Sequence, residues 1–80
     1  MIWVAAAISL GSRVRIFLNQ KSWHQGSWFA GTVTKIEPYS THRNFYWVEL
    51  DEEAQEIVGV RLISVLNLKN IEKIEPGNEH

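Results

Sequence analysis

The chain has 80 residues, of which 45% are hydrophobic and 21% are charged, and its formal net charge is −1. A chain of this length has material for one hydrophobic core, so a second domain is excluded. The absence of cysteine excludes disulfides, thiolate nucleophiles and cysteine-based zinc sites, and the charge balance argues against a protein that mainly neutralises phosphates. We therefore expect one small domain in a reducing, cytoplasmic environment.

The first nine residues are apolar and resemble the start of a signal peptide. They lack a basic region and are shorter than the roughly 20 residues that a membrane span needs, so no span is expected. We interpret residues 1–9 as an N-terminal arm or extra strand, through which the chain would form a homo-oligomer; a misassigned start codon is the alternative. Residues 10–75 form the expected domain, and residues 76–80 are expected to be a flexible tail.

The first expected strand is residues 13–18, because Val14, Ile16 and Leu18 alternate with other side chains and share one face. Residues 19–27 have turn chemistry and no hydrophobic period, which predicts a long loop. A loop of this length is more typical of binding than of connection.

The second expected strand is residues 28–37, ending before Pro38, which cannot donate a hydrogen bond to a sheet. Val33 and Ile36 cannot both face one side of a regular strand. Their spacing therefore predicts a bulge or sharp bend, which we place near Gly31.

A loop at residues 39–43 and a third strand at residues 44–51 are expected next, with Tyr46, Val48 and Leu50 on one face. By the same alternation the side chains between these three residues point outward.

The last third of the chain begins with an acidic run at residues 51–56, which we interpret as a solvated hairpin turn. A fourth strand is expected over residues 56–62, a single helical turn over residues 63–68, and a closing strand over residues 70–74. The fourth strand depends on three alternating apolar side chains: Val58, Val60 and Leu62.

Three short motifs are informative about the family: Gly-Ser-Arg-Val-Arg-Ile at residues 11–16, Trp-Phe-Ala-Gly-Thr-Val at residues 28–33, and Asn-Leu-Lys-Asn-Ile-Glu-Lys-Ile at residues 67–74. With the order of strands and loops, they resemble the SH3-like barrel superfamily. The first two are similar to the SH3-like photosystem I accessory subunits, and the second is similar to Tudor and agenet domains. The resemblance implies an all-β fold, a small five-stranded SH3-like barrel with one short 3-10 turn before the last strand.

Catalytic constellations are missing from the sequence. The histidines at positions 24, 42 and 80 have no carboxylate at a helical metal-binding spacing, and no nucleophile elbow, P-loop or dinucleotide-binding glycine pattern occurs. Paired carboxylates occur only in the acidic turn, where exposure would leave them ordinary acids. We therefore expect no enzymatic activity, no metal and no cofactor.

Aromatic side chains are the better candidates for a binding site, because four tryptophans are too many for so small a core. In SH3-like barrels the first long loop and the loop after the second strand flank a shallow groove, which accepts polyproline or methylammonium ligands. The resemblance implies such a partner-binding surface here, formed by Trp23, Trp28, Tyr39, Phe45 and Trp47. The alternative is structural: Trp28 packs at the rim of the core, and the N-terminal arm covers Phe45 and Trp47.

The leading hypothesis is a non-catalytic SH3-like module that binds a protein partner through this aromatic surface, as a small accessory subunit of a larger complex. The alternative is nucleic-acid binding through a basic and aromatic barrel face. Its phosphate contacts would be Arg13, Arg15, Lys35 and Arg43. The same four side chains also suit solvated strand positions that protect sheet edges.

Overall fold

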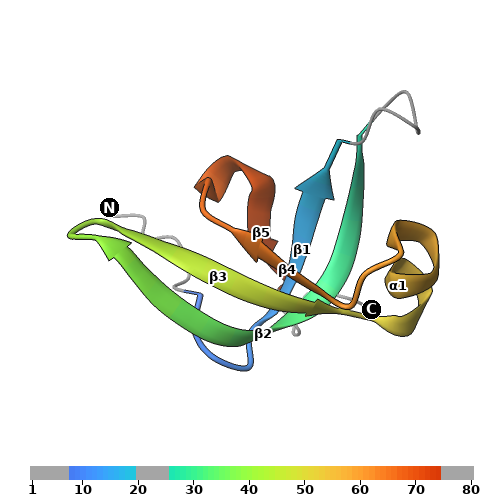
Figure 1. Cartoon of the computed structure of the whole chain (residues 1–80), viewed down its shortest axis with the longest axis horizontal. Coiled ribbons are helices and arrows are strands. Elements are labelled where there is room, and N and C mark those ends of the chain that lie inside the picture. The colour runs from blue at the N-terminus through green and yellow to red at the C-terminus, as the bar shows by residue number, and fades with distance from the viewer. Residues whose placement is uncertain (1–7, 20–25, 75–80) are drawn as a thin grey trace, which may run out of the picture.

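A computed structural model describes residues 8–19 and 26–74, which form one antiparallel sheet with two short helices (Figure 1). The sheet has five strands in the order β4-β3-β2-β1-β5. Strands β4 and β5 are its two edges, so the sheet is open. The mainly β architecture, the five strands and the 3-10 helix before the last strand confirm the predicted fold class at this level. The elements in chain order are β1 (Arg13–Leu18), β2 (Ser27–Ser40), β3 (Arg43–Leu50), α1 (Glu52–Val58), β4 (Leu62–Val65), η2 (Leu68–Asn70) and β5 (Ile71–Lys73).

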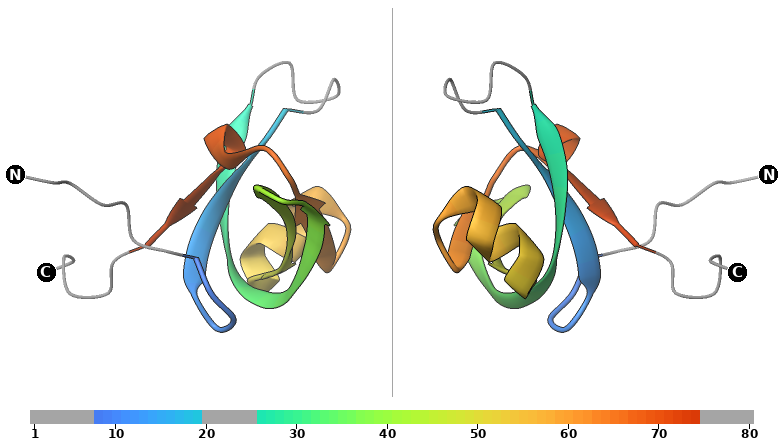
Figure 2. Two further views of the ribbon diagram at one scale, coloured as in Figure 1. Left: turned by 90° about the vertical axis from the view of Figure 1, so that its left-hand side faces the viewer. Right: turned by 90° about the vertical axis from the view of Figure 1, so that its right-hand side faces the viewer.

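Strand β2 organises the fold, because its two halves pair with different neighbours. Residues 27–32 pair with β1, and residues 31–40 pair with β3. The two pairings overlap only at Gly31 and Thr32. The ribbon curls strongly along this strand (Figure 2), so that the two halves of the sheet face each other across the core.

The spacing of Val33 and Ile36 predicted a bulge, and the structure confirms it at a different position. The register of β2 against β3 shifts between Val33 and Lys35, so the extra residue is Thr34 rather than a residue near Gly31. The shift lets Val33 lie in the core and Ile36 pack against it. An odd spacing requires a bulge somewhere between the two residues, and it lies next to the first of them.

The predicted end of the second strand at Pro38 is wrong. Pro38 lies inside β2, opposite Asn44, and the strand continues to Ser40. Among the described residues, β2 pairs only with β3 from Thr34 onward, so its other side is an edge of the described sheet. A proline is tolerated at such an edge because no neighbouring strand needs its missing N–H.

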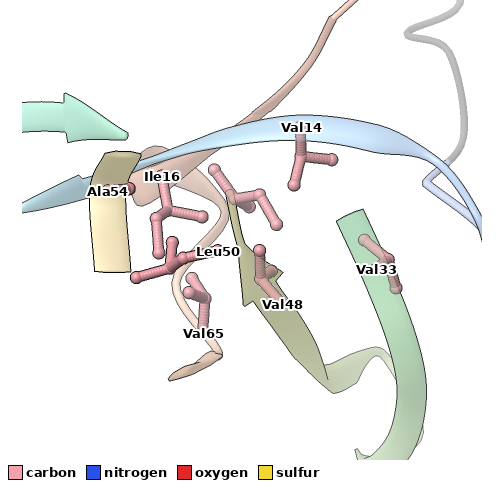
Figure 3. Packing of buried hydrophobic residues seen from close by; sticks show 8 residues of the cluster. Val14, Ile16, Val33, Val48, Leu50, Ala54 and Val65 are labelled. Atoms are coloured by element: carbon pink, nitrogen blue, oxygen red, sulfur yellow. The ribbon is translucent and has the colours of Figure 1, made fainter. Parts of the chain in front are cut away.

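The core lies between the curled halves of the sheet and under α1 (Figure 3). The alternation predicted for the first and third strands is confirmed, because Val14, Ile16, Val48 and Leu50 are buried. Tyr46 is partly buried and packs against this cluster. The other buried apolar side chains are Val33, Ala54, Val65 and Ile71.

The acidic run forms the helix α1 instead of a hairpin turn, and the predicted strand over residues 56–62 is wrong. Glutamate, alanine and glutamine are strong helix formers, and acidic residues in the first turn suit the helix dipole. Gly59 ends the helix in the left-handed conformation (φ 90°), and its N–H donates to the carbonyl of Gln55 at 2.8 Å. Ala54 is the buried residue of the helix.

The predicted helical turn over residues 63–68 is also wrong at its start. Residues 62–65 form β4, which pairs with β3, and the helical turn is limited to η2. The side chain of Asn67 accepts a hydrogen bond from the backbone N–H of Lys69 at 2.9 Å and so begins η2. Strand β5 lies within the predicted closing strand at residues 70–74.

Residues 1–7, 20–25 and 75–80 lie outside the described structure, and most of the predicted arm and all of the predicted tail fall in them. Ile8 packs against the core, and Ser12 donates its backbone N–H to the carbonyl of Ser9 at 3.0 Å in a turn before β1. Within the described ranges, neither helix has the length and apolarity to cross a membrane.

Candidate functional site

The structure places the described residues of the predicted aromatic surface in two separate groups, one near each end of β2. Strand β2 begins at Ser27, after the first loop, and ends at Ser40, before the second. The two ends of this 14-residue strand lie apart in the ribbon (Figure 1). Trp23 lies outside the described residues. The other predicted aromatic residues belong to two separate groups.

Trp28 lies at the start of β2 and packs against β1. Its ring centroid is 5.4 Å from that of Phe17, in an edge-to-face arrangement, and the guanidinium carbon of Arg15 lies 4.5 Å from the Trp28 ring centroid. The same guanidinium donates to the Glu72 carboxylate on β5 at 2.7 and 2.9 Å. Contacts of this kind support the packing interpretation of Trp28.

Tyr39, Phe45 and Trp47 lie at the other end, on the hairpin of β2 and β3. The Tyr39 and Phe45 ring centroids are 5.3 Å apart and edge-to-face. The indole N–H of Trp47 donates to Oε1 of Glu37 at 2.8 Å. This hydrogen bond and the ammonium of Lys35 lower the pKa of Glu37 below its usual range. The polar group of Trp47 is therefore already satisfied within the chain.

Three of the four predicted phosphate-binding residues are paired with carboxylates. The ion pairs are Arg13 with Asp51 at 2.6 Å, Arg15 with Glu72 at 2.7 Å, and Lys35 with Glu37 at 3.2 Å. The predicted basic face is thus largely charge-compensated. The fourth residue, Arg43, has no ion pair among the described residues.

The pairing of Arg13 with Asp51 predicts a weak dependence of stability on pH. Two hydrogen bonds from Arg13, at 2.6 and 2.8 Å, lower the pKa of the Asp51 carboxyl below its usual value of 3.8. A lowered pKa contributes stability above the unfolded-state value, and this is lost as the pH falls through the folded-state pKa. Because both side chains are more than one-third exposed, we expect Asp51→Asn to destabilise the fold by only about 0.2–1 kcal/mol at pH 7.

Urea titrations of the wild type and of Asp51→Asn at pH 7 and below pH 3.8 measure this effect. The difference between the two proteins should shrink at the lower pH. Arg13→Gln, which removes the partner instead, should reproduce the loss at pH 7. A difference that is equal at both pH values would contradict the pairing.

A pocket of about 320 Å³ opens beside the turn that joins β2 and β3. The antiparallel register brings its two walls together: Tyr46 lies opposite Val65, so the chain that leaves β4 runs along the beginning of β3. We call this site the hairpin pocket. It is lined by His42, Arg43, Asn44 and Tyr46 on one side and by Leu66, Asn67, Leu68 and Lys69 on the other.

The hairpin pocket carries positive charge that no described carboxylate pairs with. Its lining includes two cations, Arg43 and Lys69, and no carboxylate. Neither cation forms an ion pair with a described residue. Leu68 adds an exposed aliphatic side chain, with 63% of its surface accessible. The pocket offers positive charge, amide groups and an apolar rim.

The chemistry of the hairpin pocket is suited to binding. Its lining contains no serine, threonine or cysteine, and no carboxylate that could act together with His42. In the part of the chain that the structure describes, no cluster of three metal-binding side chains occurs. A carboxylate or another anion is the complementary ligand, because arginine presents a planar fork of donors and lysine a point charge.

Sequence reasoning placed only Arg43 of this pocket among the candidate residues. The lining at residues 66–69 depends on where β4 ends. The end of β4 was not predicted, because a helical turn was expected over residues 63–68. Asn67 two residues before Lys69 was the available signal, because asparagine is a preferred residue at a helix start.

Comparisons of this chain with protein-family models, with curated proteins and with solved structures find no match. The proposed function is therefore based on the geometry of the hairpin pocket.

Proposed function

We propose that this chain is a non-catalytic protein-interaction module with an SH3-like barrel architecture, and that it binds an acidic segment of a partner protein in the hairpin pocket. The strand order and the 3-10 helix between β4 and β5 support the architecture, because the resemblance to SH3-like barrels implies both.

The distribution of ion pairs is the observation that supports the binding site. Four cations of the described chain are paired with carboxylates, whereas Arg43 and Lys69 are unpaired and line one pocket. No carboxylate of the pocket pairs with these two cations. A carboxylate side chain that enters the pocket therefore forms charge-assisted hydrogen bonds with them. Leu68 and Tyr46 add apolar contacts beside these charges.

A protein ligand is favoured over a nucleic acid by the number of free cations. Binding to a nucleic-acid backbone depends on neutralising several phosphates at once. Here the arginines on β1 are already compensated, and the whole chain has a net charge of −1. Two pocket cations suit one or two carboxylates of a peptide better than a run of phosphates.

A fluorescein-labelled peptide of alternating glutamate and leucine is the probe for this proposal, measured by fluorescence anisotropy. Arg43→Glu and Lys69→Glu should each weaken binding by about tenfold or more, because each puts a carboxylate where the ligand's carboxylate binds. Lys73→Glu is the matched control, since it makes the same charge change at an unpaired lysine outside the pocket. It should leave the affinity within about twofold, as expected for a surface charge that does not line the pocket.

A glutamine version of the peptide should bind weakly to every variant. Equal loss of affinity in Lys73→Glu would show that net charge alone attracts the peptide, and would overturn the pocket. Tighter binding of a labelled single-stranded DNA, with a steep dependence on salt, would overturn the protein ligand in favour of a nucleic acid.

A further inference from the structure

The described charges of the chain separate into paired and unpaired groups. Four carboxylates pair with four cations, and the fourth of these pairs is Arg61 with Glu49 at 3.2 Å. The described carboxylates without an ion pair are all on one helix, α1: Glu52, Glu53 and Glu56. The described cations without an ion pair are Arg43 and Lys69 in the hairpin pocket, and Lys73 on β5.

The hairpin pocket and α1 lie at opposite ends of β3. Strand β3 starts at Arg43, in the hairpin pocket, and ends at Leu50, two residues before α1 begins. Seven steps along a strand correspond to about 23 Å. The β2–β3 turn faces the viewer in the left view of Figure 2, and α1 faces the viewer in the right view. Within one molecule the acidic helix cannot reach the pocket.

Each end also exposes aliphatic side chains next to its charges. Leu68 is at the rim of the hairpin pocket, and Ile57 on α1 has 61% of its surface accessible. Val60 and Leu62, which follow the helix, are exposed as well. The acidic end and the basic end are therefore complementary in both charge and apolar surface.

We infer that the hairpin pocket of one molecule binds the α1 end of a second copy of this chain, so that molecules associate head to tail. The inference rests on the proposed function of the pocket and names one ligand for it. Because the two contacting surfaces differ and lie at opposite ends, each molecule keeps one free end of each kind. Such a contact forms open chains or closed rings rather than a symmetric dimer.

Sedimentation velocity of the full chain over a concentration series measures the association. The sedimentation coefficient should rise with concentration and fall when salt screens the charges. A pocket variant, Arg43→Gln with Lys69→Gln, and a helix variant, Glu52→Gln with Glu56→Gln, should each associate about tenfold more weakly than the wild type. Lys73→Gln is the matched control and should associate like the wild type.

Mixing the two variants distinguishes head-to-tail contact from other modes. The pocket variant keeps an intact acidic helix, and the helix variant keeps an intact pocket. An equimolar mixture should therefore form a species of two chains and no longer assemblies. Circular dichroism of each variant, compared with the wild type, establishes that glutamine at the two helix positions leaves α1 folded.

Several outcomes would overturn the inference. A wild-type chain that stays monomeric to millimolar concentration, yet binds the acidic peptide, would refute the second copy and leave the proposed function intact. A chain that neither associates nor binds the peptide would refute both. Association that persists in both variants, and is lost in a chain without residues 1–9, would assign the contact to the N-terminal segment instead.

Discussion

An Ile16→Ala variant should lose a large part of the free energy of unfolding. Ile16 is fully buried, in the middle of β1, opposite Phe29 of β2 on one side and Ile71 of β5 on the other. Removing a buried isoleucine down to alanine costs about 2–5 kcal/mol, because apolar contact is lost and a cavity remains. A domain of this size has on the order of 5 kcal/mol of net stability, so the loss is comparable with the whole.

Urea denaturation followed by tryptophan fluorescence measures the loss. Ile16→Val is the matched control, because it removes one methylene and should cost only about 0.5–1.5 kcal/mol. An alanine variant as stable as the valine variant would show that the core collapses around the gap, and that β1 is not held as tightly as the burial of Ile16 indicates.

Among substitutions that add one carbon atom to a residue outside the core cluster, Gly31→Ala should destabilise the fold most. A Cβ at Gly31 would lie 2.6 Å from the backbone oxygen of Glu49 and 2.6 Å from Cγ1 of Val48. The first of these atoms belongs to the backbone of β3 and cannot rotate away. Separating β2 from β3 at this point should cost about 1–3 kcal/mol or more.

The same denaturation experiment tests Gly31→Ala. Ser40→Ala, at the exposed end of the same strand, is the control and should unfold like the wild type within about 0.5 kcal/mol. A wild-type denaturation midpoint for Gly31→Ala would contradict the close approach of the two strands.

The first and third strands could be predicted from the sequence because each has one buried face. Val14 and Ile16 alternate with exposed arginines, and Val48 and Leu50 alternate with partly exposed residues. Burial of one face makes apolar side chains alternate with polar ones along a strand. This alternation can be recognised without knowledge of the neighbouring strands. The need for a bulge in β2 follows from the same parity, whereas its position depends on the register with β3.

The helix α1 was not predicted, because a helix-forming segment and an alternating, strand-like pattern overlap in this part of the sequence. Val58, Val60 and Leu62 alternate as a strand would, but they belong to the end of α1, to the connection and to β4. The helix is decided by the residues before them, from Glu52 to Glu56, which favour a helix individually, and by Gly59, which ends it. Local helix propensity outweighed a short alternating pattern.

The candidate site was missed for a different reason, because it depends on which segments the sheet brings together. The predicted groove followed from the resemblance to SH3-like barrels, in which the first two loops flank one surface. Among the described residues, Trp28 lies near the start of β2 and Tyr39 near its end. The hairpin pocket forms from the start of β3 and the end of β4, which are joined by strand register rather than by sequence proximity.

Pro38 also affects how readily the unpaired edge of β2 can pair with a strand of another molecule. Beyond Thr34 no described strand pairs with one side of β2, and unpaired strand edges can pair with strands of other molecules. Proline deletes a backbone donor from that edge, so an incoming strand cannot complete a continuous ladder along it. A foreign strand that pairs along this edge of the hairpin would therefore lack a hydrogen-bond partner at Pro38.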